Sequence, residues 1–419
     1  MNRTDTTYFY ERFRAVASGI LETGFTTFLL LIAVKWFTFG ATAKALISAA
    51  GALGFLLGPA VVSRVAEAGW TTAQAASKLM LAASLGFLVI SIVENRWLFI
   101  AGIILTTTMA TAAVPLVTQI YQENYPRTSR GKFFSRTAMI RISSAAIFGL
   151  AAGWILNSHT NENQLSNYPH WLLGIFSGAL IVAAFCFSRT PGKPLAKAKG
   201  THPFRSLRFV KEDKLFRHIL ICWMLFGVGN LMLFPLRVEY LANAGAYSDD
   251  YTLNFEPTPV HIALILVFIP NAIKLVSSPI WGGLFDRMNF FILRVVLNFF
   301  FATSLVIFFN SESMIGLIIA AVLFGIANSG GEVAWSLWVT KFAPPKHVAD
   351  YMSVHVFFNG IRVFLSPFLG FWLIGIISAS SLSLFSAGII LASSLALLSD
   401  YPAGEKAKRG TALTKEITD

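Results

Sequence analysis

The chain has 419 residues, of which 55% are hydrophobic and only 13% are charged, and its lysines and arginines exceed its acidic residues to give a formal net charge of +12. This composition extends along the whole chain and excludes a soluble globular domain, because such a domain could not keep so much apolar surface away from water. We therefore expect an all-α polytopic membrane protein. The positive charge is interpreted as a topology signal with attraction to anionic lipid headgroups, not as a nucleic-acid-binding surface.

Hydrophobic stretches of about 20 residues, enough to cross a bilayer, follow one another in two groups of six. The first six are expected at 13–38, 41–63, 72–93, 97–120, 134–156 and 170–188. The second six are expected at 216–243, 259–283, 291–310, 313–339, 351–375 and 379–399. The predicted domains are a six-helix bundle at 1–188, a basic cytoplasmic linker at 189–215, a second six-helix bundle at 216–399 and a cytoplasmic tail at 400–419. Within the linker, 203–211 is either a short amphipathic helix on the membrane surface or solvated chain.

Lysine and arginine residues concentrate on one side of this topology. Both ends of the chain, the connection after the fourth span and the linker are rich in them, whereas the opposite side holds little more than Lys35, Lys44, Arg96 and Arg237. Cytoplasmic loops carry the excess of basic residues, so both termini are expected in the cytoplasm of a protein of the plasma (inner) membrane. We expect a monomer.

The two groups of spans repeat one another. The matching positions are Ser63 with Asp286, Thr118 with Thr340, Arg141 with Arg362, and Gly149 with Gly370. All four pairs have a separation of about 222 residues. The offset between the first and seventh spans is smaller, 205 residues if Gly24 matches Gly229, which is explained if 245–258 is an insertion in the second half.

One loop sequence gives a specific resemblance. Gly282-Gly283-Leu284-Phe285-Asp286-Arg287 resembles the G-x-x-x-D-R loop of the major facilitator superfamily, and a degraded copy with Ser63 and Arg64 follows the second span. Arg130-Gly131-Lys132 resembles the basic signature after the fourth span, and Pro344-Pro345 stands in the equivalent place after the tenth. The resemblance covers nearly the whole chain. It implies two pseudo-symmetric six-helix bundles around a central cavity, with Gly282, Asp286, Arg287 and Arg64 in gating loops.

Five of the expected spans carry polar residues every three or four positions, which places them on one face of each helix. These stripes are Ser18, Glu22 and Thr26; Thr137, Arg141 and Ser144; Asn271, Lys274 and Ser278; Asn328, Glu332 and Trp335; and His355, Asn359, Arg362 and Ser366. A charge inside a bilayer is costly and usually serves a substrate, an ion or a proton. The stripes are therefore expected to face each other or a water-filled cavity.

Each candidate residue has an expected role. Lys274 and Arg362 would bind an anionic group, and the substrate site would be completed by Asn271, Asn359, Asn328, Trp335 and Asn230. Glu22 and Glu332 would carry the coupling proton, and Arg141 and His355 would belong to the charge network. Two alternatives stay open: Glu332 neutralises Lys274 or Arg362, and Glu22 is permanently satisfied. Trp338 is expected beside Trp335 at the cavity.

Helix packing and bending also leave signals. Gly54-x-x-x-Gly58 and Gly149-x-x-x-Gly153 predict close helix contacts, as do Gly282 and Gly283. Interruptions of the spans are expected at four prolines, namely Pro115, Pro235, Pro270 and Pro367.

The favoured function is a secondary active transporter that moves a small anionic or zwitterionic organic solute by alternating access, coupled to protons. The same scaffold could instead export lipophilic cations, with Glu22 as the recognition acid, if Glu332 locks Lys274 and Arg362. A third possibility is a non-transporting receptor. An enzyme is not expected, because His261 and His355 lack metal-ligand spacing and no glycine-rich phosphate loop is present. No cofactor or metal is expected; the partners would be the solute, H+ and lipid.

Overall fold

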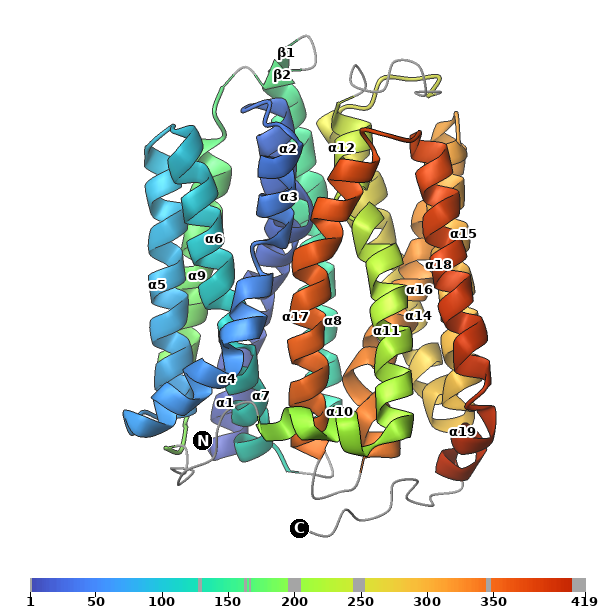
Figure 1. Ribbon diagram of the computed structural model, residues 1–419. Helices are drawn as coiled ribbons and strands as arrows, with labels where there is room; N and C mark the ends of the chain where they lie inside the picture. Colours follow the sequence, from blue (N-terminus) through green and yellow to red (C-terminus); the bar gives the residue numbers. More distant parts are fainter. Residues whose placement is uncertain are drawn as a thin grey trace. The chain divides into compact units, whose positions relative to one another are not determined.

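The computed structural model describes residues 2–126, 130–161, 164–165, 167–194, 205–243, 253–343 and 348–408. Within these ranges the chain is almost entirely helical (Figure 1), apart from an antiparallel pair of two-residue strands, β1 (Thr160–Asn161) and β2 (Gln164–Leu165). Twelve helices in the described part are long and apolar enough to cross a membrane. They coincide with the twelve predicted spans, so the predicted fold class is confirmed.

The first half contains six of the membrane-spanning helices, several of them divided into shorter segments. They are α1 (Arg3–Thr23), the π-helix η1 (Gly24–Phe28), α2 (Leu29–Lys35), α3 (Ala41–Ala49), α4 (Ala52–Glu67), α5 (Thr72–Ile92), α6 (Arg96–Ala112), α7 (Val114–Asn124), α8 (Arg130–Ser158) and α9 (His170–Arg189). Helix α5 packs on α6 and α9, and α1 packs on α8 and α9.

The second half follows the same plan. It consists of η2 (Arg205–Arg208), α10 (Phe209–Glu212), α11 (Lys214–Leu233), α12 (Leu236–Ala242), α13 (Pro259–Ala263), the π-helix η4 (Leu264–Phe268), α14 (Ile269–Arg287), α15 (Phe290–Asn310), α16 (Met314–Phe342), α17 (Val348–Leu373), α18 (Ala379–Leu398) and α19 (Tyr401–Lys408). Helix α16 packs on α14 and α15, and α18 packs on α11 and α15.

Three of the four prolines accompany an interruption of helical structure. Helix α6 ends two residues before Val114, where α7 begins with Pro115 in its first turn. Pro235 separates α11 from α12, and Pro270 is the second residue of α14, which follows η4. Pro367 instead lies inside the continuous helix α17. A π-bulge inserts one extra residue into a helix and often occurs at functional sites; η1 lies just after Glu22.

The described end of the linker is ordered against the second half. Residues 205–212 form η2 and α10, and Phe209 is buried with its ring centroid 4.7 Å from that of Tyr351. Asp213 caps α11 through the Phe216 amide at 2.9 Å and accepts the Tyr351 hydroxyl at 2.9 Å. This end of the linker therefore docks on protein through Phe209. Residues 195–204 lie outside the described chain.

The chain divides into two compact units. Unit 1 contains Met1–Pro203 with Val238–Asn243 and Pro257–Phe268, and unit 2 contains Phe204–Arg237, Ala244–Glu256 and Ile269–Asp419. The observed division therefore differs from the one predicted at the linker, because two short segments of the second half, Val238–Asn243 and Pro257–Phe268, belong to unit 1. The packing of α13 and η4 on α8 accounts for one of them: a side chain at Gly149 would collide with Val267, and one at Gly153 with Ala263.

A methyl group at Gly149 should therefore destabilise unit 1. We expect Gly149→Ala to lower the melting midpoint of the purified protein, because Val267 occupies the space that the new Cβ needs. Gly178 is the matched control. It lies in α9 with no atom within 4 Å of an added Cβ among the described residues, and alanine is about 1 kcal/mol more favourable than glycine within a helix. An equal midpoint for both variants would contradict the proposed close packing.

Candidate functional site

An ion pair between Glu22 and Arg141 links α1 to α8 in unit 1. The two helices approach closely because Gly19 has no side chain: a Cβ there would collide with the Arg141 carbonyl oxygen and with Ser144. The Ser144 hydroxyl also donates to the Val16 carbonyl at 2.9 Å. The Glu22 and Arg141 side chains keep 26% and 23% of their surface exposed. The pair is thus embedded in a membrane-spanning segment but accessible to a ligand or a proton.

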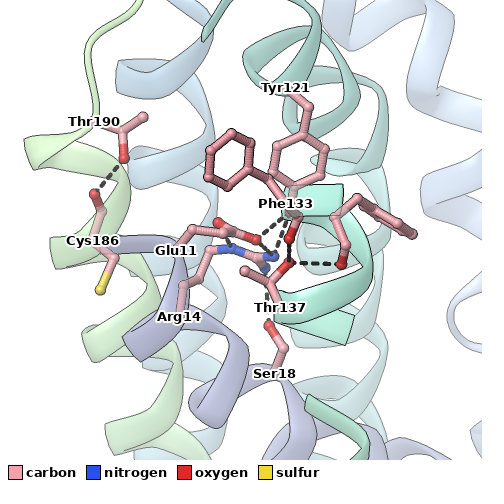
Figure 2. Close-up of polar contacts among 9 residues, drawn as sticks. Glu11, Arg14, Ser18, Tyr121, Phe133, Thr137, Cys186 and Thr190 are labelled. Atoms are coloured by element: carbon pink, nitrogen blue, oxygen red, sulfur yellow. Dashed lines mark hydrogen bonds and ion pairs between the residues drawn. The ribbon is translucent and has the colours of Figure 1, made fainter. Parts of the chain in front are cut away.

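A second polar cluster in unit 1 was missed from the sequence. Figure 2 shows Glu11, Arg14 and Tyr121 pointing toward one another. Arg14 donates through Nε to Glu11 at 2.7 Å, through Nη1 to Ser18 at 2.9 Å and through Nη2 to the Tyr121 hydroxyl at 2.8 Å, and that hydroxyl also bonds Glu11. The signal was present, because Glu11, Arg14 and Ser18 continue the stripe of Glu22 with helical spacing.

The corresponding ion pair of unit 2 joins Lys274 on α14 to Glu332 on α16, with Nζ and Oε2 2.5 Å apart. Helices α14 and α16 are in close contact because a Cβ at Gly325 would meet Ile273 and the Pro270 carbonyl oxygen. The two partners differ sharply in exposure: the Lys274 side chain is 5% exposed and that of Glu332 is 35% exposed. The sequence left both Lys274 and Arg362 open as partners of Glu332, and the structure pairs Glu332 with Lys274.

The amides predicted around these charges lie on the same helices. Asn271 is about one turn from Lys274 on α14, and Asn328 is about one turn from Glu332 on α16; both are partly buried. Asn230 lies on α11, and its Oδ1 is buried with no hydrogen-bond partner in the described chain.

Arg362 has different partners from Lys274. It is buried on α17 and donates through Nε to Asn359 at 2.8 Å and through Nη1 to the Trp223 carbonyl at 2.6 Å. Gly227 makes room for it, because a Cβ there would collide with the guanidinium. No carboxylate of the described residues forms an ion pair with Arg362 within 4 Å. The two cations therefore have different partners. Lys274 is neutralised by an acid, whereas Arg362 is held by neutral oxygen atoms.

His355 is surrounded by aromatic rings. It is 1% exposed, and its ring centroid is 5.4 Å from that of Trp223, 5.6 Å from that of Trp335 and 5.3 Å from that of Trp338. Trp335 is partly buried. The expectation that Trp338 is a cavity residue is wrong: it is fully buried, because its ring packs against Phe216 and Phe290 in the core of unit 2.

The predicted gating-loop residues lie at the C-terminal end of α14. Asp286 and Arg287 are exposed. Nearby, Lys341 donates to the Phe285 carbonyl at 2.5 Å; burial lowers the pKa of Lys341, and the attraction of Asp286 opposes that shift. The expectation that Gly282 and Gly283 permit close helix approach is wrong within the described chain, because an added Cβ at either would have no atom within 4 Å.

The other loop residues are less informative. Arg64 forms an exposed pair with Glu67 at 3.3 Å. Of Arg130-Gly131-Lys132 only the helical backbone is described, and Pro344-Pro345 lie outside the described residues.

Comparison with known proteins identifies the architecture. The family model described as Major Facilitator Superfamily matches residues 15–309 and 240–417. No curated protein matches the chain significantly.

Several solved structures share the fold. A point mutant of the nucleoside transporter NupG superposes with a TM-score of 0.73 at 12% identity, covering 94% of this chain and 99% of that chain. A D-xylose–proton symporter gives a TM-score of 0.65 at 12% identity, covering 94% and 97%. An inward-facing, occupied bacterial homolog of the human lysosomal transporter Spinster gives 0.59 at 12% identity, covering 96% of each chain. At these identities the similarity shows the fold alone.

Proposed function

Since the chain belongs to the Major Facilitator Superfamily, we propose that it is a secondary transporter that moves a small organic solute by alternating access and couples this movement to protons. The observation that carries the proposal is that each unit has, within its spans, an ion pair whose acid is partly exposed: Glu22–Arg141 in unit 1 and Lys274–Glu332 in unit 2. Both acids are partly exposed, so each pair can exchange its internal partner for a solute group or a proton.

The physical basis of coupling is the competition for these carboxylates. A proton that binds Glu22 or Glu332 removes the negative charge and weakens its attraction to Arg141 or Lys274. The released cation can then bind a solute anion. Protonation and solute occupancy would therefore alter each other's affinity, which is the thermodynamic requirement for coupling.

The favoured substrate is a small anionic or zwitterionic solute, contacted by Lys274, Arg362 and the amides of Asn271, Asn328, Asn359 and Asn230. Neighbours of the same fold are described as transporters of nucleosides and of D-xylose with protons, which supports a small polar solute. One observation favours a second candidate. Lys274 is already neutralised by Glu332, and a site in which Glu22 exchanges Arg141 for a cationic solute would suit export of a lipophilic cation.

Proton movement distinguishes the candidates. Purified protein would be reconstituted in liposomes that contain a pH-sensitive dye, and anionic, zwitterionic, neutral and cationic solutes would be added in turn. An anionic or zwitterionic solute should drive protons across the membrane, either in the same direction as the solute or in the opposite direction. A response confined to lipophilic cations would establish the second candidate, and no response to any class would leave a non-transporting receptor.

The orientation is part of the proposal: both termini in the cytoplasm of a plasma-membrane protein. Glu162→Cys and Lys406→Cys, each in a cysteine-free background, should react with a membrane-impermeant maleimide from opposite sides, because an odd number of spans separates them. Ala403→Cys is the control for Lys406→Cys and should label from the same side. Labelling of residues 162 and 406 from one side would contradict the proposed topology.

A further inference from the structure

Among the described residues of unit 2, Arg294 is the most deeply buried charge. It lies on α15 within the span Phe290–Asn310 and is 2% exposed. Its guanidinium carbon is 4.1 Å from the centre of the Trp223 ring and 4.6 Å from that of Phe226. One nitrogen, Nη2, donates to Asn298 at 2.7 Å, whereas Nη1 is buried with no hydrogen-bond partner in the described chain.

Arg362 and His355 approach the same indole from α17. The Arg362 guanidinium carbon is 5.8 Å from the centre of the Trp223 ring, and the His355 ring centroid is 5.4 Å from it. Both ring nitrogens of His355 are buried without a hydrogen-bond partner among the described residues. The bonds of Arg362 to Asn359 and Trp223 use Nε and Nη1, so Nη2 is left for another acceptor.

The unsatisfied groups around Trp223 are mainly donors. They comprise Arg294 Nη1, the indole Nε1 of Trp338 and one nitrogen of His355. Within the described chain no acid forms an ion pair with either arginine. Stacking on Trp223 and Phe226 recovers only part of the penalty for removing a guanidinium from water. A cluster with two cations and spare donors therefore lacks an anionic acceptor.

We propose that Arg294 and Arg362, with His355, form an anion-binding site inside unit 2 that takes a compact oxyanion, a carboxylate or a phosphate. Because the guanidinium presents a planar fork that matches two oxygens of such a group, an oxyanion is favoured over chloride. Asn298 and Asn359 hold the two forks in position. Lys274 contributes less to anion binding than the sequence predicts, because Glu332 already neutralises it.

Access to this buried site rests on the proposed function, since a conformational change must open unit 2 to the ligand. The oxyanion has two possible sources with the same chemistry, a soluble organic acid or phosphate and the phosphodiester of an anionic lipid.

Thermal unfolding of the full-length purified protein tests the site without transport. The probes are sodium succinate and sodium phosphate, compared with sodium chloride at matched ionic strength, and the readout is tryptophan fluorescence. In the native protein we expect at least one oxyanion to raise the melting midpoint saturably, by about 5 °C at saturation. Arg294→Gln and Arg362→Gln should abolish this shift. A second arm compares lipid nanodiscs with and without phosphatidylglycerol, and a shift seen only there identifies the headgroup as the source.

Arg237→Gln is the matched control. Arg237 is also buried over two rings, 4.7 Å from the centre of Phe234 and 3.8 Å from that of Phe324, but it is not part of the Trp223 cluster, so the oxyanion shift should persist. If Arg294→Gln fails to fold, Arg294→Lys keeps the charge without the fork and should weaken binding about tenfold.

Two results would overturn the site: no oxyanion or anionic lipid stabilises the native protein, or Arg294→Gln keeps the full shift. Failure of the proposed function gives a different pattern, in which the oxyanion shift is retained but no solute drives proton movement in liposomes.

Discussion

Glu332→Gln should destabilise the protein far more than Lys274→Met, although both substitutions break the same ion pair. Without the carboxylate, the Lys274 ammonium stays at a position where only 5% of its side chain is exposed, and an uncompensated buried charge costs about 3 kcal/mol or more. Without the lysine, Glu332 still has 35% of its side chain exposed and can remain hydrated, so the loss should be about 1 kcal/mol. The order of the melting midpoints tests this asymmetry.

The double variant Lys274→Met/Glu332→Gln is the decisive control. It removes both charges and should recover most of the stability that Glu332→Gln alone loses, which corresponds to a coupling of about 2 kcal/mol between neighbouring sites. Glu67→Gln, which breaks the exposed pair with Arg64, should leave the midpoint unchanged. Equal midpoints for Glu332→Gln and Lys274→Met would mean that Lys274 reaches water by another route.

The twelve spans could be predicted because a bilayer imposes the same requirement on each segment. In hydrocarbon every backbone group must be bonded internally, so about 20 apolar residues imply a helix. Hydropathy does not say which helices touch. The segment 257–268 packs on unit 1 through small-residue contacts such as Gly153 with Ala263, and a glycine shows where a contact is possible without showing its partner. The segment 238–243 is joined to unit 1 by the ion pair of Glu239 with Lys44.

The polar stripes were predictable for the same reason, but the partners of each charge were not. Glu332 could have reached Lys274 or Arg362 from its sequence position, and the contact of α14 with α16 decides for Lys274. Arg294 lies five residues from the start of its span, where an arginine is normally a topology signal. Its burial depends on Trp223 and Phe226 from another helix, and no local pattern reports that. Glu11 and Arg14 were missed although their spacing matched that of Glu22.

Glu22→Gln should uncouple solute accumulation from a pH gradient while preserving downhill exchange. The amide resembles the protonated acid in shape and charge, so the variant can still complete the solute-bound half of the cycle but cannot take up and release a proton. If one proton moves with each solute, a gradient of one pH unit supplies about 1.4 kcal/mol and sustains an accumulation ratio of about ten. In the variant this ratio should fall to about one, measured in liposomes with the most active solute of the proton-movement assay.

Two controls separate loss of coupling from loss of structure. Glu67→Gln removes an exposed acid that pairs with Arg64 and should accumulate solute like the native protein. Arg141→Gln removes the other partner of Glu22, in a pair whose side chains are both about one quarter exposed. It should impair exchange as well as accumulation, because it removes the cation that Glu22 would release to the solute anion. If Glu22→Gln still concentrates solute under a proton gradient, Glu22 is not the carrier. Glu332, whose exchange with Lys274 offers the same competition in unit 2, is then the next candidate for the coupling proton.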